Sequence, residues 1–163
     1  EAATAQLGVR LPPPGGTAGA GELTVAGLGP DEWLVLAPPA SAVEADLRAA
    51  LGTHHCSIVD VSAHRTTIAL DGTHAADVLA HGCALDLHPA RFPPGSVAQT
   101  TLAGAGVVLL ARPAGGPSGA DPRESGRSGG GYWLLVRSSY ARHLAGWLAD
   151  ACVEYLNPTV YYG

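Results

Sequence analysis

The segment VDVSAHRTTIALDGTHAADVLAHGCALDL, residues 59–87, decides the fold that this sequence predicts. Residues 58–62 and 66–70 are rich in β-branched and apolar side chains, so we expect a strand at each. Asp71-Gly72 marks a turn, and a helix with a small apolar face of alanine and valine follows it. Small side chains let a helix lie close on a sheet, so this unit is predicted to form the core.

Three helices are indicated by apolar residues at helical spacing. The central helix is predicted to end at Gly82. A second follows a capping-box pattern at 41–44, and a third has Leu144, Trp147, Leu148 and Ala151 at helical spacing. The predicted N-terminal caps are Thr73, Ser41, and either Ser138 or Ser139.

Further strands are predicted at 22–28, 33–37, 96–102, 107–110 and 132–137. The fourth of these is the most apolar, so we expect it at the centre of a sheet. Strand–helix units flank a central β-β-α-β-β arrangement. We therefore predict an α+β fold with one mixed, mostly antiparallel sheet and about three helices on one face.

The 163 residues suggest about one domain. Residues 1–21 are rich in proline, glycine and alanine, and we expect a flexible N-terminal arm outside the core. Residues 22–152 are predicted to form a single α+β domain, within which 113–131 is a mobile Gly/Ser loop. Residues 153–163 form a C-terminal tail in this division.

The composition excludes several classes of function. The net charge is −5, which leaves no electrostatic footprint for nucleic acid. All nine basic residues are arginine, which excludes a lysine Schiff base and a P-loop lysine. The longest apolar run, 105–111, is shorter than the roughly 18–20 residues of a membrane span. No signal segment opens the chain, and we expect a cytoplasmic protein.

The cysteines and histidines do not predict a metal site. Cys56, Cys83 and Cys152 are widely spaced, so we expect three buried free thiols. His54-His55-Cys56 offers three donors in a row, but adjacent residues of an extended chain point to opposite faces. His81 and Cys83 lie on either side of a helix end.

One set of polar residues has the composition of a nucleophilic triad, namely Asp60, Ser62 and His64. No G-x-S-x-G pattern accompanies it. We favour a structural interpretation, in which Asp60 and Ser62 bond turn amides and Arg65 pairs with Asp60. The glycine pairs at 27–29 and 104–106 each precede a strand, so no nucleotide cofactor is expected. The sequence thus predicts no catalytic, cofactor-binding or metal-binding residue in this chain.

Several motifs occur together along residues 22–152. They are Trp33-Leu34-Val35-Leu36, Val59-Asp60-Val61-Ser62 with Arg65, Leu70-x-Gly72, Gly82-Cys83-x-Leu85-Asp86-Leu87-His88-Pro89, Phe92-x-Pro94-Gly95, Gln99-Thr100 and Leu135-Val136-Arg137-Ser138. In this order they resemble the gamma subunit of heterotetrameric sarcosine oxidase, and the stretch from Gly82 to Pro89 is the most specific. Ala63, the loop at 113–131 and the tail depart from the family pattern.

The resemblance implies a non-catalytic structural subunit. The complex of that family oxidatively demethylates sarcosine to glycine, transfers the one-carbon unit to tetrahydrofolate and releases hydrogen peroxide. The resemblance further implies that FAD, FMN, NAD, tetrahydrofolate and zinc are held by partner subunits and none by this chain. Its partners would be the alpha and beta subunits, with delta in the same complex.

More distantly, the chain is similar to the folate-binding aminomethyltransferase fold of the glycine-cleavage T-protein, in reduced form. In that family, acidic residues that serve folate chemistry end one strand. The corresponding positions here fall within 106–110, where leucine stands in their place. Two alternatives to the structural subunit stay open. One is a stand-alone folate-binding module, and the other is the gamma chain of a related N-methyl amino acid dehydrogenase complex, such as N-methylglutamate dehydrogenase.

Overall fold

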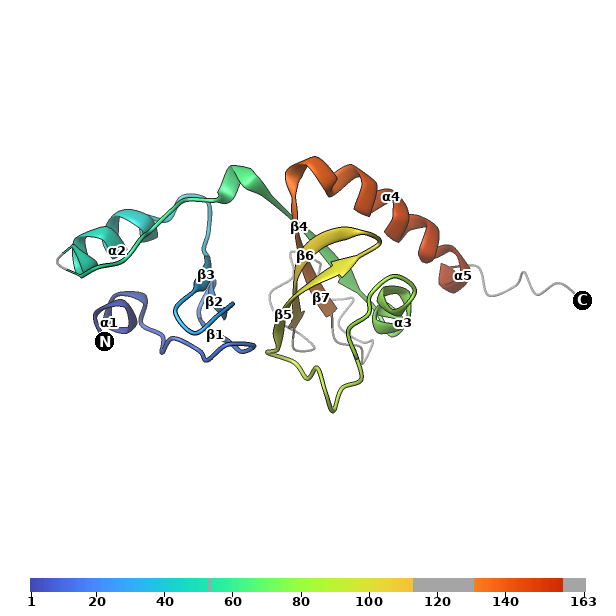
Figure 1. Cartoon of the computed structure of the whole chain (residues 1–163), viewed down its shortest axis with the longest axis horizontal. Coiled ribbons are helices and arrows are strands. Elements are labelled where there is room, and N and C mark those ends of the chain that lie inside the picture. The colour runs from blue at the N-terminus through green and yellow to red at the C-terminus, as the bar shows by residue number, and fades with distance from the viewer. Residues whose placement is uncertain (53, 113–130, 157–163) are drawn as a thin grey trace, which may run out of the picture.

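The computed structural model of the chain describes residues 1–52, 54–112 and 131–156 (Figure 1). A three-stranded antiparallel sheet has the order β1-β2-β3, and a four-stranded antiparallel sheet has the order β4-β7-β6-β5. The strands are β1 (Thr17–Ala20), β2 (Leu23–Gly27), β3 (Trp33–Leu36), β4 (Arg65–Asp71), β5 (Val97–Leu102), β6 (Ala105–Arg112) and β7 (Gly131–Arg137). The helices are α1 (Ala2–Leu7), α2 (Val43–Leu51), α3 (Ala75–Ala80), α4 (Ala141–Ala151) and α5 (Val153–Leu156), with short 3₁₀ turns η1 (Ser62–His64) and η3 (Ser138–Tyr140).

Three clusters of apolar side chains order the molecule into four layers. One cluster lies between the two sheets, where β2 and β3 face β5, β6 and β7. A second lies on the outer face of the three-stranded sheet, with α1 and α2. The third lies on the outer face of the four-stranded sheet, with α3 and α4. Figure 1 shows the resulting order of helix pair, sheet, sheet and helix pair.

Alternate side chains of each inner strand enter opposite clusters. In β2, Ala26 faces the second sheet and Val25 faces α1 and α2. In β6, Val108 faces the first sheet and Leu109 faces α3 and α4. Successive side chains of a strand point to opposite faces, so a strand covered on both sides must be apolar throughout. This explains the apolar run of β6 and confirms its predicted central place.

Backbone hydrogen bonds join the edges of the two sheets. The Val97 N–H donates to the Gly15 carbonyl oxygen at 2.9 Å, and the Thr17 N–H donates to the Gly95 carbonyl oxygen at 2.8 Å. Residues 15–17 thus connect the start of β1 to the start of β5. The sheets are therefore linked by polar contacts at one edge as well as by the apolar cluster between them.

The α+β class is confirmed, and the strands divide between two antiparallel sheets in place of the single mixed sheet expected. Helices cover both outer faces because each sheet has an apolar outer side. All five further strands predicted from the sequence are present, as β2, β3, β5, β6 and β7. β3 is an edge strand. Within the described parts of the chain, no helix has the length and apolar character needed to cross a bilayer.

The prediction that residues 1–21 lie outside the core is wrong. They contain α1 and β1, and Leu7 is only 8% exposed in the cluster with α1 and α2. The proline-rich stretch lies against β3, because the Trp33 indole N–H donates to the Pro12 carbonyl oxygen at 2.9 Å. Composition reports local backbone preferences, whereas burial and hydrogen bonding decide whether a terminal segment packs on the body.

The central segment holds one strand, β4, instead of the two predicted. Residues 58–61 have no strand pairing and lead directly into η1. The Asp60 carboxylate accepts a hydrogen bond from the Ser62 backbone N–H at 2.8 Å, and such local bonds compete with strand pairing. Residues 55–61, which we call the crossing segment, instead carry the chain from one half of the molecule to the other (Figure 1).

The helix ranges were predicted better than the helix caps. α2, α3 and α4 begin after Ala42, His74 and Tyr140, and no side chain caps any of these three starts. The predicted caps were Ser41, Thr73, and Ser138 or Ser139, and all are wrong. The two serines lie in η3, where the Ser138 hydroxyl donates to the Ala63 carbonyl oxygen at 3.2 Å.

Two predicted segments fall largely outside the described residues. Of the loop at 113–131, the structure describes Gly131, which begins β7. Of the tail at 153–163, it describes residues 153–156, which form α5. The described part of the tail is therefore helical.

Candidate functional site

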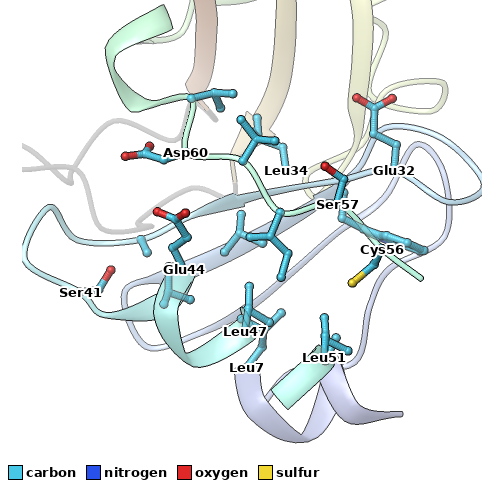
Figure 2. A pocket seen from close by; sticks show the side chains of 18 of the residues that line it. Leu7, Glu32, Leu34, Ser41, Glu44, Leu47, Leu51, Cys56, Ser57 and Asp60 are labelled. Carbon is cyan, nitrogen blue, oxygen red and sulfur yellow. The ribbon is translucent and has the colours of Figure 1, made fainter. Parts of the chain in front are cut away.

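A groove of about 960 Å³ lies between α1, α2, β3 and the crossing segment (Figure 2). Cys56, Asp60 and Ser62, whose side chains could carry chemistry, line this groove. Its apolar lining includes Leu7, Leu34, Leu47, Leu51 and Ile58. Its carboxylate lining consists of Asp31, Glu32, Glu44 and Asp60.

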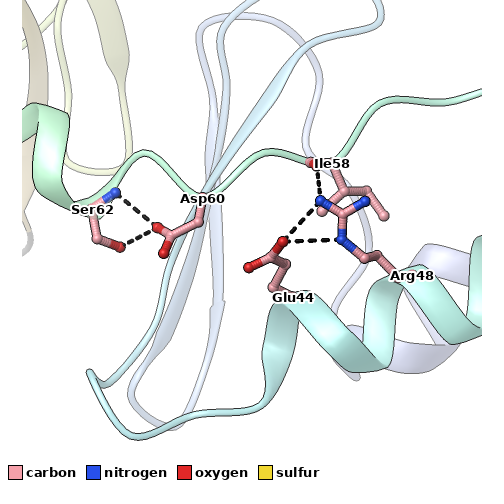
Figure 3. A network of polar contacts seen from close by, with 5 residues as sticks. All are labelled: Glu44, Arg48, Ile58, Asp60 and Ser62. Atoms are coloured by element: carbon pink, nitrogen blue, oxygen red, sulfur yellow. Dashed lines mark hydrogen bonds and ion pairs between the residues drawn. The ribbon is translucent and has the colours of Figure 1, made fainter.

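One polar network holds the crossing segment against α2 (Figure 3). The Arg48 guanidinium donates to the Ile58 carbonyl oxygen at 2.5 Å. Its Nε and one terminal nitrogen also donate to Glu44 Oε1, at 3.0 and 2.8 Å. Both side chains of this ion pair are about half exposed, and pairs of this kind contribute only about 0.3–0.5 kcal/mol. The packing of Ile58 beside α1 and α2 is therefore the stronger restraint on the segment.

Asp60 and Ser62 form a closed turn (Figure 3). Asp60 Oδ1 accepts hydrogen bonds from the Ser62 hydroxyl at 2.5 Å and from the Ser62 backbone N–H at 2.8 Å. The hydroxyl bond, and next the backbone bond, lower the pKa of Asp60 below its ordinary value of 3.8, because both stabilise the carboxylate. The prediction that Asp60 bonds a turn amide is confirmed. The predicted Arg65–Asp60 ion pair is absent from the described residues.

The geometry does not assemble a nucleophilic triad. The Ser62 hydroxyl donates to a carboxylate, and in the described parts of the chain no hydrogen bond joins it to His64. The His64 backbone N–H donates to the Val61 carbonyl oxygen at 3.0 Å. A serine activated for attack needs a base within hydrogen-bond reach of its oxygen, so these three residues lack the required arrangement.

Two histidines of the second half, His74 and His81, belong to a surface cluster that the sequence did not predict. His81 Nε2 lies 3.1 Å from Glu154 Oε1 and 3.5 Å from the Tyr155 hydroxyl. The His74 ring stacks on the Tyr155 ring with centroids 4.8 Å apart. These contacts hold α5 against α3. Residues 74 and 155 are too far apart in sequence for their pairing to give a local signal.

No group of three or more histidine, cysteine, aspartate or glutamate side chains in the described ranges is placed to hold a metal ion. Of the three cysteines, Cys56 is exposed, whereas Cys83 and Cys152 are partly buried. The prediction of three buried thiols is therefore wrong. The absence of metal and cofactor sites in this chain stays a prediction.

Arg112 is the most buried charged residue of the described parts, at 8% exposed. It pairs with Asp71 across the ends of β6 and β4, and its guanidinium carbon lies 5.1 Å from the Trp133 ring centroid. An alanine Cβ at Gly131 would overlap the ends of both charged side chains, so the pair would have to shift. These contacts give the arginine a structural role at the end of the sheet.

The leucines of β6 are core residues. Leu109 and Leu110 are each 1% exposed, and they pack into the clusters on opposite faces of the four-stranded sheet. Leu110 also lines a pocket together with Arg112. The leucines of this strand therefore serve packing.

Comparison with known proteins assigns the family. The sequence pattern of the sarcosine oxidase, gamma subunit family, matches residues 1–154. The chain is 38% identical over 162 residues to sarcosine oxidase subunit gamma of Arthrobacter sp, an alignment that covers 98% of this chain and 72% of the relative. It is 37% identical over 134 residues to the same subunit of Corynebacterium sp. (strain P-1), covering 82% of this chain and 58% of the relative.

A solved structure has the same fold. It is the heterotetrameric sarcosine oxidase from Corynebacterium sp. U-96 in complex with pyrrole 2-carboxylate. One of its chains matches with a TM-score of 0.79 and 34% identity, covering 94% of this chain and 72% of that one. The fold, the identities and the length of the match agree with one another. The chain belongs to the sarcosine oxidase gamma subunit family.

Proposed function

We propose that this chain is a non-catalytic structural subunit of a heterotetrameric complex that oxidatively demethylates sarcosine to glycine. The observation that carries the proposal is the family match over residues 1–154. The solved relative, at a TM-score of 0.79, is a heterotetrameric sarcosine oxidase, which supports other subunits as the partners of this chain. We assign those partners as the alpha and beta subunits, with delta in the same complex.

The geometry supports a role in assembly over a role in chemistry. The Ser62 hydroxyl donates to Asp60 and has no base beside it, and the Arg112 charge is paired with Asp71. The distant resemblance to folate-binding aminomethyltransferases aligns their acids with β6, whose leucines here are buried. Under this proposal the partner subunits hold FAD, FMN, NAD, tetrahydrofolate and zinc, and the complex works in the cytoplasm.

Co-expression with the alpha and beta subunits of the proposed complex tests the proposal. We expect the chain to co-purify with them, and we expect the complex to oxidise sarcosine with release of hydrogen peroxide. The chain purified alone should show no flavin absorbance and no sarcosine turnover. Failure to assemble with those subunits would overturn the proposal, as would calorimetric heat of tetrahydrofolate binding to the chain alone. Turnover of N-methylglutamate in place of sarcosine would keep the structural role and change the assigned substrate.

A further inference from the structure

The rim of the groove in Figure 2 carries negative charge that the chain leaves largely uncompensated. Among the described residues that line it there are four carboxylates and no lysine or arginine. Glu44 is paired with Arg48, which lies beside the groove. No arginine of the described ranges lies within ion-pair distance of Asp31, Glu32 or Asp60. The hydrogen bonds from Ser62 further favour the ionised form of Asp60.

The floor of the same groove is apolar and incompletely covered. Leu34, Leu51 and Ile58 line it and are only partly buried. At its edge, Val59 is 68% exposed and Trp33 is 36% exposed. Apolar surface rimmed by polar groups is typical of sites where another protein docks. Here the rim is acidic, so the charge of the partner is restricted as well as its hydrophobicity.

We propose that this groove receives a segment of a larger partner subunit in which apolar side chains are flanked by arginine or lysine. The apolar side chains cover the floor between α2 and the crossing segment, and the cations meet Asp31, Glu32 and Asp60. This inference rests on the proposed function, because it takes the partner from the same complex. A second copy of this chain fits less well, since each copy carries a net charge of −5 and like charges repel.

Charge reversal on the rim provides the test. In the co-expressed complex, the double variant Asp31→Arg/Glu32→Arg is compared with the double variant Glu22→Arg/Asp46→Arg. Both pairs are exposed, both change net charge equally, and the second pair lies outside the groove. We expect the first variant to bind the larger subunits about 100-fold more weakly at low salt, because like charges then face each other across the contact. The second should bind like the unmodified chain.

The outcomes separate this inference from the proposed function. If the unmodified chain assembles and both double variants assemble equally well, the groove is not the docking site although the structural role stands. If the unmodified chain does not assemble, the proposed function fails, and the groove has no partner in this complex. A homodimer that the Asp31→Arg/Glu32→Arg variant dissociates would assign the groove to a second copy and overturn the inference.

A pair of neutral variants keeps the test valid if charge reversal disturbs folding. Val59→Ser alters the exposed edge of the groove, and Val153→Ser alters an equally apolar residue of α5 that is 53% exposed. Neither removes a buried side chain, so circular dichroism should show both to be folded. We expect Val59→Ser to weaken assembly about tenfold and Val153→Ser to leave it unchanged. Equal assembly of the two would contradict the proposed docking site.

Discussion

Replacing Gly27 by alanine should destabilise the chain more than replacing a strand glycine that has open space around it. The added Cβ would lie 2.3 Å from the Pro13 carbonyl oxygen and 3.0 Å from the Pro12 carbonyl oxygen, well inside van der Waals contact. These are backbone atoms, so relief requires the chain at 12–16 to move away from β2. That movement strains two hydrogen bonds, from the Gly15 N–H to the Gly27 oxygen and from the Gly27 N–H to the Gly16 oxygen, each 2.9 Å.

The free-energy cost follows from these contacts. Overpacking costs about 1–3 kcal/mol, and weakening each hydrogen bond adds about 0.5–1.5 kcal/mol, for a total of about 2–6 kcal/mol. At about 2–4 °C for each kcal/mol in a chain of this size, a central value of about 4 kcal/mol lowers the melting temperature by about 8–16 °C. Thermal unfolding followed by circular dichroism measures this shift.

Gly106→Ala is the matched control, because Gly106 also lies in a strand and nothing lies within 4 Å of its added Cβ. We expect the control to change stability by less than about 0.5 kcal/mol. If Gly27→Ala melts at the same temperature as Gly106→Ala, the close approach of residues 12–13 to β2 is wrong. The contacts that place the N-terminal segment on the body would then have to be revised.

Three other substitutions test separate parts of the structure. Leu144→Ala removes a fully buried side chain between α4 and the four-stranded sheet and should cost about 2–5 kcal/mol in chemical denaturation. Ser62→Ala removes the hydroxyl that most lowers the pKa of Asp60, so a carboxyl NMR titration should show that pKa rising toward its ordinary value. Because the folded-state pKa is lowered, the stabilisation from this turn is present above the ordinary carboxyl pKa and is lost as the pH falls through the folded-state value. Gly146→Ala, at an exposed position of α4 with open space around its Cβ, should stabilise the chain by about 1 kcal/mol, measured by thermal unfolding.

Strands and helices with strong periodicity could be predicted from the sequence. The apolar run of β6 and the spacing of Leu144 and Leu148 in α4 identify buried faces directly. The pairing of strands into two sheets could not be predicted, because it depends on contacts such as Ile68 with Leu134 that are distant in sequence. Helix caps were wrong because a shift of one residue at a helix start moves the capping oxygen out of reach.

Of the candidate site, one local contact could be predicted from the sequence, and the shape could not. The bond between Asp60 and Ser62 is local, so residue types and spacing indicate it. The groove depends on α1, which composition placed in a flexible arm, and on the crossing segment, which its β-branched residues placed in a strand. Neither misassigned element offers a pattern that reveals its tertiary neighbours. The acidic rim could therefore not be recognised before Asp31 and Glu44 were seen on one surface.

The apolar cluster shared by the two sheets makes each half of the chain dependent on the other. Ala26 and Leu34 come from the first sheet, and Val108 and Leu135 come from the second. If either half were synthesised alone, the apolar face of its sheet would be exposed to solvent and would favour aggregation. Unfolding is thus expected to occur in one cooperative step. The ribosome completes the first sheet before the second. During synthesis, the inner face of the first sheet therefore stays exposed until β5, β6 and β7 pack against it.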